Sequence, residues 1–392
     1  MTSPKPDLLA GLRPEALAAP ESGIVEVFNH GRGRQGLLPL WVGEGDMPTP
    51  AFICEAATRS LAAGETFYTH QRGIPELREA IARYIGRVYA VALPPGRFFA
   101  TAGGMQALQI AVRMVAGGGD EVIVPTPAWP NFVGALSVAG ARPVQLPLQL
   151  RAGSWMLDMA RLAAAVTPAT RAIVVNTPGN PTGWTATPEE LSEILELARA
   201  HGLWIIADEI YGRMTYDMAR APSFRDLAGP DEKVMYVQTM SKNWAMTGLR
   251  VGWLEAPEAL GQTVENLVQY SSSGLPVPLQ RAAVAALERG EEFVAHQIGR
   301  FRKNRDLLCE ALAATGRVDF ARPPAAFYLF ARVRGHADSH ALALRLIEEA
   351  NVGVAPGTAF GAGGEDHVRI CFARNSADMA EAARRLALWL SR

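Results

Sequence analysis

The chain has 392 residues, a formal net charge of -1 and hydrophobic residues at 49% of its positions. Such a near-neutral chain, with no long run of one charge sign, argues against nucleic acids and anionic membranes as main partners. Its length and apolar content are sufficient for a large core divided among two or more domains.

The N-terminal residues and the cysteines both favour a cytoplasmic protein. Residues 1–14 contain prolines and charges but lack the apolar stretch of a secretory signal. No uninterrupted apolar segment reaches the roughly 18 residues that a membrane-spanning helix needs. Cys54, Cys309 and Cys371 are few, odd in number and widely separated, so we expect reduced core thiols and neither disulfides nor a metal site.

The middle of the chain alternates short apolar runs with amphipathic stretches. The apolar runs are rich in β-branched and aromatic residues and indicate buried strands at residues 121–124, 171–175, 203–207 and 234–237. Helical patterns lie between them at residues 105–115 and 188–201, and the second opens with a Thr-Pro-Glu-Glu sequence typical of a capped helix start. This alternation predicts an α/β fold with a mainly parallel sheet covered on both faces.

The pattern changes near residue 290. A long helix is predicted from residue 291 to 314, followed by short strands at 327–333 and 368–372 and a final helix. We interpret this part as a smaller α+β domain, against which the N-terminal segment packs. The predicted organisation is an N-terminal segment at residues 1–45, a large domain at 46–288 and a small domain at 289–392.

Polar or aromatic residues follow each of the four predicted strands. Trp129 comes shortly after the first, and an Asn-Thr-Pro-Gly-Asn-Pro-Thr-Gly segment at 176–183 follows the second. Asp208 and Tyr211 come after the third strand, and residues 239–242 follow the fourth. A turn or a helix cap would explain each cluster singly. Because ligands bind beyond the carboxyl ends of parallel strands, their joint occurrence predicts one ligand site at this rim.

Lys242 is the residue with the most specific chemistry, since a lysine amine condenses with an aldehyde to form a Schiff base. The chain holds 38 Lys and Arg residues, of which Lys5, Lys233, Lys242 and Lys303 are the lysines. Near Lys242 stand Thr239, Ser241 and, eight positions on, Arg250.

A phosphate site is predicted beside this lysine. Gly103-Gly104 precedes the helical pattern at 105–115, and exposed N–H groups at a helix start favour a phosphate. A simple turn explains the two glycines equally well when they are taken alone. With the hydroxyls of Thr239 and Ser241 and the guanidinium of Arg250, they would complete a phosphate-binding cup.

These motifs resemble those of the class I/II aminotransferases, which are pyridoxal-phosphate enzymes of fold type I. The resemblance covers almost the whole chain, from residues 43–50 through Tyr68 and 73–78 to 354–361 and Arg369. It implies a large domain with a mostly parallel, seven-stranded type of sheet between helices. The smaller α+β domain is implied to come from the C-terminal part plus the N-terminal segment.

The resemblance also implies the cofactor, pyridoxal 5'-phosphate, and its contacts. Lys242 would hold it covalently and then carry protons, Asp208 would keep the pyridine nitrogen protonated, and Tyr211 would hydrogen-bond the ring oxygen. These three are the implied catalytic residues. The other implied cofactor contacts are Gly103, Gly104, Met105, Trp129, Asn180, Thr239, Ser241, Arg250 and Tyr68.

Substrate and subunit contacts follow from the same resemblance. Arg369 would clamp the α-carboxylate of the substrate, with help from Asn180 and the backbone of Gly43. Tyr68 resembles a tyrosine that reaches the phosphate from the neighbouring subunit, so the resemblance implies a homodimer with shared active sites. The implied small-molecule partners are amino acids and 2-oxo acids.

Some positions depart from the family pattern. Thr239 stands where Ser or Gly is usual, Gly45 replaces a common proline, and Ala325 replaces a glycine. Met105 stands where an aspartate-specific branch has a lysine that pairs with the distal carboxylate of the substrate. We therefore expect a neutral, apolar or aromatic donor in preference to aspartate, unless another arginine, such as Arg32 or Arg34, supplies the charge.

The predicted reaction is ping-pong transamination, in which an L-amino acid gives its amino group to the cofactor and a 2-oxo acid takes it back. A carbon–sulfur β-lyase is the alternative on the same fold, because fold alone does not separate the two reactions. A third alternative is that the chain serves as the effector-binding module of a transcription regulator. It would need a DNA-binding domain ahead of the fold, whereas the family pattern begins near residue 40.

Overall fold

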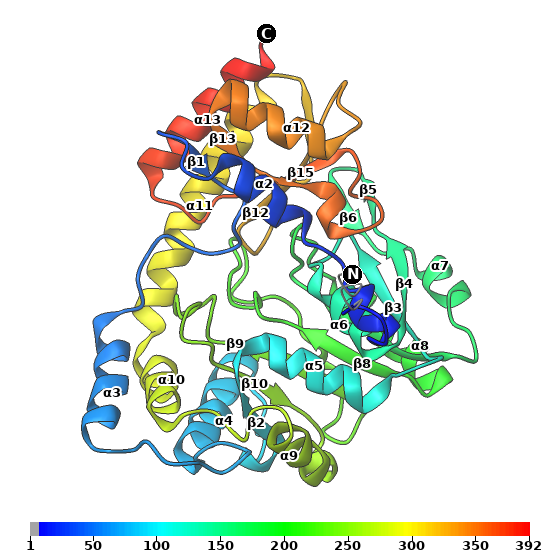
Figure 1. Cartoon of the computed structure of the whole chain (residues 1–392), viewed down its shortest axis with the longest axis vertical. Coiled ribbons are helices and arrows are strands. Elements are labelled where there is room, and N and C mark those ends of the chain that lie inside the picture. The colour runs from blue at the N-terminus through cyan, green and yellow to red at the C-terminus, as the bar shows by residue number, and fades with distance from the viewer. Residues whose placement is uncertain (1–7) are drawn as a thin grey trace, which may run out of the picture.

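The computed structural model describes residues 8–392, and its centre is a seven-stranded sheet with the order β2-β10-β9-β8-β7-β3-β4 (Figure 1). The strands are β2 (Phe98–Thr101), β3 (Glu121–Thr126), β4 (Arg142–Pro147), β7 (Thr170–Asn176), β8 (Trp204–Asp208), β9 (Val234–Thr239) and β10 (Gly252–Glu255). The β3–β4, β3–β7, β7–β8 and β8–β9 pairings are parallel, whereas β10 is antiparallel to both neighbours. The predicted α/β fold with a mostly parallel sheet is confirmed.

The central strands bury both faces because helices cover both sides of the sheet. In β7, Ala172 and Val174 pack in a core with α5 (Gly103–Val115), α6 (Asn131–Ala139) and α9 (Gly261–Gln269). The alternate residues, Ile173 and Val175, pack in the core that includes α8 (Pro188–His201). A third core holds α3 (Ala51–Ala62), α4 (Pro75–Tyr89) and α10 (Val277–Arg289) against β2 and β10.

The predicted helix at 188–201 has the observed bounds of α8. Its start is held by a capping box, in which the Thr187 side chain and the Glu190 side chain each accept a hydrogen bond from the other's backbone N–H. Gly202 ends the helix in the left-handed conformation. In contrast, α5 begins at Gly103, two residues before the predicted start. The four predicted strands each end one or two residues after the apolar run, and β8 also begins one residue later than predicted.

Three strands of the large sheet had no counterpart among the apolar runs. β2 and β10 are four residues long, which is too short for a clear periodicity. β4 lies at the edge of the sheet, contains Pro143 and Pro147, and buries only part of its surface. Their place in the sheet depends on pairing with strands far away in the sequence.

A second, four-stranded antiparallel sheet has the order β11-β12-β15-β14, and it lies at the upper end of the molecule in Figure 1. Its strands are β11 (Val318–Phe320), β12 (Tyr328–Val333), β14 (Ala355–Pro356) and β15 (His367–Cys371). The helices of this part are α11 (Glu291–Ala313), α12 (Ser339–Arg345), the π-helical turn η4 (Leu346–Ala350) and α13 (Ser376–Leu390). The predicted long helix, the two strands and the final helix all occur here.

The N-terminal segment reaches both parts of the molecule. β1 (Leu38–Pro39) pairs in parallel with β13 (Val352–Gly353), and α2 (Gly23–Gly31) contacts α12 and β14. The short α1 (Pro14–Leu17) instead contacts α6 of the large sheet. The division at residues 45 and 288 stays a prediction.

The remaining elements are short. They are η1 (Pro95–Arg97), β5 (Gln149–Arg151), β6 (Ser154–Met156), α7 (Met159–Ala164), η2 (Phe224–Asp226), η3 (Glu258–Leu260) and η5 (Gly357–Phe360). None of the helices in residues 8–392 combines the length and the apolar composition that crossing a bilayer requires.

Candidate active site

A cavity of about 270 Å³ opens at the carboxyl ends of the central parallel strands. Strand register explains why the residues there meet: Asn176 at the end of β7 pairs with Asp208 at the end of β8, which pairs with Val237 on β9. The predicted residues that line the cavity are Gly43, Gly104, Met105, Trp129, Asn180, Asp208, Tyr211, Thr239, Ser241, Lys242, Arg250 and Arg369. The structure thus brings most of the predicted set into one space.

Lys242 lies in the cavity wall just after β9. Its Nζ donates a hydrogen bond to the Gly43 carbonyl oxygen at 2.7 Å. A side chain at Gly43 would place its Cβ 2.6 Å from the Tyr328 hydroxyl oxygen, so this backbone approach requires glycine. Burial lowers the pKa of the Lys242 amine to about 8. A substantial fraction of the amine is therefore uncharged and nucleophilic at mildly alkaline pH.

Asp208 is a buried carboxylate that lacks a close cation among the described residues. Its Oδ1 accepts a hydrogen bond from the Ile210 backbone N–H at 3.3 Å, and its backbone oxygen accepts one from Asn176 Nδ2 at 3.2 Å. Burial raises the pKa of the Asp208 carboxyl to about 7, and the adjacent Glu209 acts in the same direction. A positively charged group placed against Asp208 would favour its ionised form.

Two buried tyrosines meet at the cavity, Tyr211 from the turn after β8 and Tyr328 from β12 of the second sheet. The hydroxyl oxygens of Tyr211 and Tyr328 lie 2.8 Å apart, and their rings pack edge to face with centroids 5.7 Å apart. Burial raises the pKa of both phenols above the usual value of 10. Both tyrosines are therefore neutral at pH 7, and because one hydroxyl donates to the other, the pair has one O–H left to donate to a ligand.

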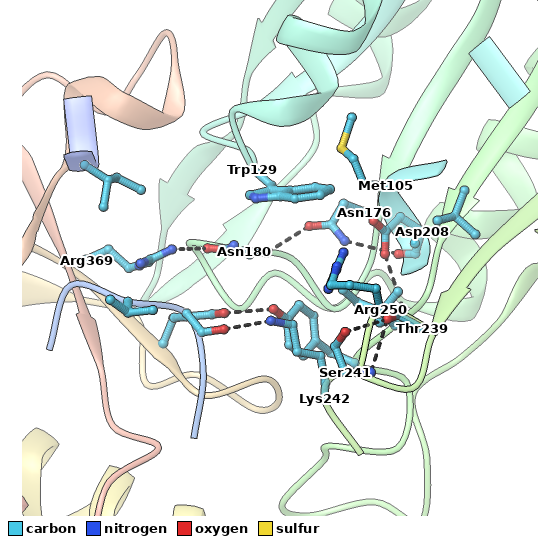
Figure 2. A pocket seen from close by; sticks show the side chains of 18 of the residues that line it. Met105, Trp129, Asn176, Asn180, Asp208, Thr239, Ser241, Lys242, Arg250 and Arg369 are labelled. Atoms are coloured by element: carbon cyan, nitrogen blue, oxygen red, sulfur yellow. Dashed lines mark hydrogen bonds between the residues drawn. The ribbon is translucent and has the colours of Figure 1, made fainter. Parts of the chain in front are cut away.

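Arg369 on β15 approaches the cavity from the second sheet, and Figure 2 shows it with Asn180 at the end opposite Asp208. Its Nη1 donates to Asn180 Oδ1 at 3.0 Å, and its Nη2 donates to the Trp41 carbonyl oxygen. Within the described part of the chain, its Nε has no hydrogen-bond partner although it is buried. A guanidinium with a free donor in a cavity suits a carboxylate ligand.

The Asp208 end of the cavity offers donors for an anion. Gly104 lies in the first turn of the 13-residue helix α5, where backbone N–H groups are unpaired. Thr239 Oγ1 donates to Ser241 Oγ at 2.9 Å, so the two hydroxyls are adjacent. Arg250 completes the group with a guanidinium directed at the same end of the cavity (Figure 2).

Backbone conformation holds this anion site together. Gly103 has a φ of +76°, and a Cβ there would lie 2.6 Å from Arg250 Nη2. Gly103 does not itself line the cavity but allows the arginine to pass beside the helix start. Arg250 has a φ of +53°, which is uncommon for a residue with a side chain and is typical of functional sites.

Tyr68 and two arginines lie outside the cavity. Tyr68 is 95% exposed, so within one chain it contacts no part of the site, and its role toward a neighbouring subunit stays a prediction. Arg34 donates to Asn351 Oδ1 and to the Glu348 carbonyl oxygen, and neither Arg32 nor Arg34 lines the cavity. Neither arginine therefore supplies a charge to the cavity within one chain, and the suggestion that one of them serves substrate binding stays a prediction.

Sequence reasoning missed several lining residues. Tyr328, Asn176 and the backbone of Trp41 contact predicted site residues directly. Asn176 Oδ1 accepts a hydrogen bond from the Asn180 backbone N–H at 2.9 Å and so shapes the turn that carries Asn180. Asn176 lies in the Asn-Thr-Pro-Gly segment that was recognised as a motif, so its place in the site could have been predicted from the sequence. No sequence pattern pointed to Ile24 or Trp41, which also line the cavity.

A family model described as "Aminotransferase class I and II" matches residues 37–386. The chain belongs to the class I and II aminotransferases. This aminotransferase is 34% identical to aromatic-amino-acid aminotransferase 2 of Thermococcus litoralis, over 93% of this chain and 94% of that protein. It is also 34% identical to the aspartate/prephenate aminotransferase of Thermus thermophilus, over 97% of both chains.

Solved structures agree with the family. A single mutant of Thermus thermophilus aspartate aminotransferase matches this aminotransferase with a TM-score of 0.90 and 34% identity, over 96% of this chain and 99% of that one. The predicted fold type and the predicted enzyme class, a transaminase, are confirmed. The relatives' names cover both aromatic and acidic substrates and so leave the donor open.

Proposed function

We propose that this aminotransferase binds pyridoxal phosphate through Lys242 and moves the amino group of a neutral or aromatic L-amino acid to a 2-oxo acid by a ping-pong mechanism. The observation that carries the proposal is the arrangement of one cavity. A buried amine and a buried carboxylate lie in it, with Arg250 and Arg369 at opposite ends. Two separated cations suit a cofactor phosphate at one end and a substrate carboxylate at the other.

The residues present fit the cofactor. Asp208, which lacks a close cation among the described residues, would face a protonated ring nitrogen, and Trp129 would cover the ring face. The first turn of α5, the hydroxyls of Thr239 and Ser241, and Arg250 would hold the phosphate. When bound, pyridoxal phosphate supplies the electron sink that allows the α-proton of an amino acid to leave.

The protein supplies position and proton transfer. Lys242, whose amine has a pKa of about 8, can accept and release a proton near neutral pH. Arg369 would fix the α-carboxylate through its free Nε, and Asn180 orients Arg369 by accepting from Nη1. The Tyr211–Tyr328 pair holds a neutral phenol ready to donate. Burial of these groups excludes water and strengthens each interaction.

The lining of the cavity favours an uncharged substrate side chain. Its cations are Lys242, Arg250 and Arg369, and all three have a role in the proposed reaction. Met105 and Trp129 pack against the same hydrophobic core, and Met105 Sδ accepts a hydrogen bond from Asn131 Nδ2 at 3.4 Å. A distal carboxylate would meet no further cation among the described lining residues, which is costly for a desolvated charge.

The donor preference can be tested with single amino acids. We expect phenylalanine, tyrosine or leucine to bleach the absorbance band of the bound cofactor with a kcat/KM at least roughly tenfold above that of aspartate, since an unpaired buried charge costs more than about 1.4 kcal/mol. Met105→Lys should raise kcat/KM for aspartate by about tenfold, whereas Met105→Leu should not. Aspartate as the best donor of the wild-type enzyme would contradict the proposal.

Removal of Arg369 is expected to weaken substrate binding selectively. Arg369→Ala should raise KM for the amino acid by roughly 30- to 100-fold, because a charge-assisted bidentate contact is worth about 2–3 kcal/mol. Cofactor content, measured by absorbance after dialysis, should stay near that of the wild type, and Arg369→Lys should lose less affinity than Arg369→Ala. Loss of the cofactor in Arg369→Ala would show that this arginine belongs to the phosphate end.

The β-lyase alternative is not favoured, because the relatives are named as aminotransferases. The donor assay separates the two, since a lyase releases pyruvate and ammonia without a 2-oxo acid. A homodimer with shared sites and a cytoplasmic location stay predictions. Phe67, Tyr68 and Tyr270 are 84%, 95% and 88% exposed, which is consistent with a second subunit covering them.

A further inference from the structure

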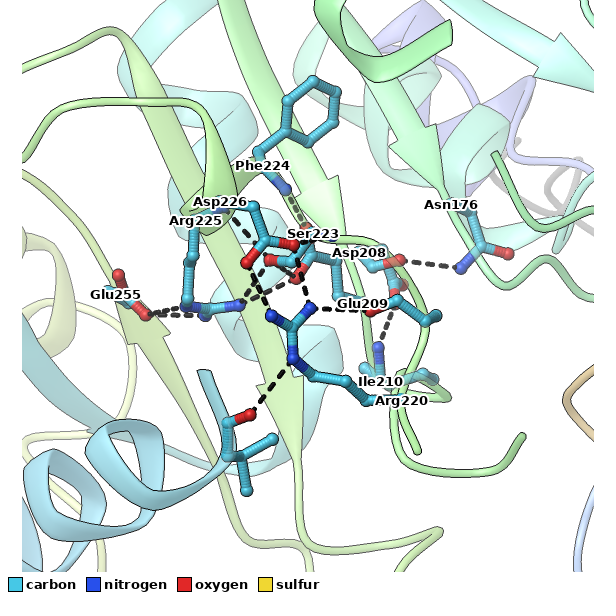
Figure 3. Close-up of polar contacts among 12 residues, drawn as sticks. Asn176, Asp208, Glu209, Ile210, Arg220, Ser223, Phe224, Arg225, Asp226 and Glu255 are labelled. Carbon is cyan, nitrogen blue, oxygen red and sulfur yellow. Dashed lines mark hydrogen bonds and ion pairs between the residues drawn. The ribbon is translucent and has the colours of Figure 1, made fainter. Parts of the chain in front are cut away.

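A buried ion cluster lies next to the candidate active site (Figure 3). Glu209 follows Asp208 directly at the end of β8, and its Oε2 accepts hydrogen bonds from Ser223 Oγ at 2.6 Å and Arg225 Nη1 at 2.7 Å. Arg225 also donates from Nε and Nη2 to Glu255 Oε2, at 2.9 and 2.6 Å. The side chains of this triad, Glu209, Arg225 and Glu255, are 1%, 2% and 1% exposed.

Arg225 spans one strand of the large sheet. On β9, Tyr236 pairs with Ala207 of β8 on one side and with Glu255 of β10 on the other. The guanidinium carbon lies 3.8 Å from the ring centre of Tyr236 and 4.8 Å from that of Tyr89 on α4. Arg225 thus joins the end of β8 to β10 between two aromatic faces, which a planar guanidinium suits.

The charge of Glu209 matters because of its position. Arg225 is the cation hydrogen-bonded to Glu209, and the charge of Glu209 acts on the adjacent Asp208 carboxyl, whose pKa it raises, so a loss of Arg225 would leave this charge without its hydrogen-bonded counter-ion. Charges on neighbouring buried residues, in a site with an effective dielectric constant of about 20, change each other's proton affinities by about one pH unit or more. When one partner of a buried ion pair is removed, the charge of the other is no longer offset and acts in full on neighbouring groups.

Other charged groups around the triad are already paired. Arg97 Nη2 lies 4.0 Å from Glu255 Oε1, so Glu255 keeps a nearby cation when Arg225 is removed. Arg220 forms a bidentate ion pair with Asp226, with N–O distances of 2.7 and 2.8 Å. On the cavity side, Asp208 is influenced by Lys242 and lies near Tyr211. Both carboxylates lose hydrogen bonds when Arg225 is lost, but only Glu209 is then left without an ion-pair partner among the described residues.

We propose that the Glu209–Arg225–Glu255 triad is a positioning device for Asp208. Arg225 offsets the charge of Glu209 and fixes the turn after β8, so that Asp208 stays ionised toward the ring nitrogen of the bound cofactor. Arg225 does not line the cavity, and so it acts through Glu209. The inference rests on the proposed function, because it requires pyridoxal phosphate to bind against Asp208.

The test is a pH titration of the absorbance of the bound cofactor at fixed ionic strength. Arg225→Met should move the midpoint to higher pH by about one unit, since an uncompensated carboxylate favours protonated forms of the site. Glu209→Gln should move it to lower pH, because the negative charge is lost while Arg225 remains. The double variant Glu209→Gln/Arg225→Met should return the midpoint close to that of the wild type.

Two controls separate charge from packing. Arg225→Lys keeps the positive charge and should leave the midpoint within roughly 0.3 units of the wild type, well below the one-unit effect of a lost charge. Arg199→Met removes an arginine of α8 that pairs with Glu196 and Glu232 and has no contact with the triad, and it should behave likewise. Equal shifts in Arg225→Met and Arg225→Lys, or a double variant that is not restored, would overturn the proposal in favour of a packing role.

Two further outcomes are decisive. If Arg225→Met does not fold, the test rests on Glu209→Gln. A titration midpoint in that variant that is unchanged, or that moves to higher pH than in the wild type, overturns the inference. Equilibrium dialysis of pyridoxal phosphate with the wild type tests the proposed function itself, on which the role of the triad rests. A wild type that binds no cofactor refutes the proposed function and the triad's role with it. A wild type that binds and titrates normally, beside variants with unmoved midpoints, refutes the triad's role alone.

Discussion

Lys242→Ala is expected to abolish transamination, with a fall in kcat on the order of 10⁵-fold, the scale seen when a covalent catalytic group is removed. The physical reason is that, in the proposed mechanism, this side chain supplies both the covalent attachment and the proton carrier. Its amine lies in the cavity with a pKa lowered to about 8 by burial, which alanine cannot reproduce. The variant should still fold, because truncation of Lys242 removes one hydrogen bond to the Gly43 backbone and no other hydrogen bond described for its side chain.

The measurement combines kinetics with chemical trapping. Borohydride reduction of the wild-type enzyme should add the mass of the cofactor to the peptide that contains Lys242, and Lys242→Ala should show no such label. Lys303→Ala is a matched control, because Lys303 is exposed on α11 and lies outside the cavity. Activity above about 1% of the wild type in Lys242→Ala, or a label on another lysine, would refute the assignment.

Asp208→Asn is expected to have the second-largest effect, a fall in kcat of roughly 10³-fold, the scale of losing one electrostatic interaction made in the transition state. The amide has nearly the same shape as the carboxylate but cannot stabilise a protonated ring nitrogen by charge. Pyridoxal phosphate should also bind more weakly, which equilibrium dialysis measures. Asp231→Asn, at an exposed aspartate, is the matched control and should leave both quantities unchanged.

The same variant should be more stable than the wild type when no cofactor is bound. Burial raises the pKa of Asp208 from 3.8 to about 7 in the folded protein, so ionisation opposes folding. This cost is absent below pH 3.8, grows as pH rises, and is fully present above pH 7. Asparagine does not ionise, and Asp208→Asn should therefore raise the Tm of the cofactor-free protein at pH 8. A lower Tm would show that the carboxylate is stabilised by contacts that the amide loses.

Residues from both sheets line the cavity. Asp208 and Asn180 follow strands of the large sheet, whereas Arg369 and Tyr328 lie on strands of the second sheet. The Arg369–Asn180 and Tyr211–Tyr328 hydrogen bonds cross between them. The groups proposed to bind substrate and cofactor are therefore held at a fixed separation only when both sheets are correctly packed, which favours preorganisation of the reacting groups.

The features that the sequence alone predicted well depend on interactions between residues only a few positions apart. The bounds of α8 follow from Thr187, Glu190 and Gly202, which satisfy the helix ends by contacts within four residues. The central strands follow from their apolar runs, because strands buried on both faces need apolar residues throughout. The position of Lys242 and Asp208 at the carboxyl ends of strands then places both at one rim without knowledge of distant contacts.

Only the tertiary structure decided the features that join distant segments. The reversed strand β10, the tyrosine hydroxyls 117 residues apart and the bond from Arg369 to the Trp41 carbonyl depend on long-range packing. So does the triad, since Glu209, Arg225 and Glu255 carry no common sequence signal. The sequence by itself determined the residue types, their order along the sheet and hence the family. Which side chains touch, and how burial tunes Asp208 and Lys242, was decided by the fold, because desolvation depends on neighbours that the chain brings together only on folding.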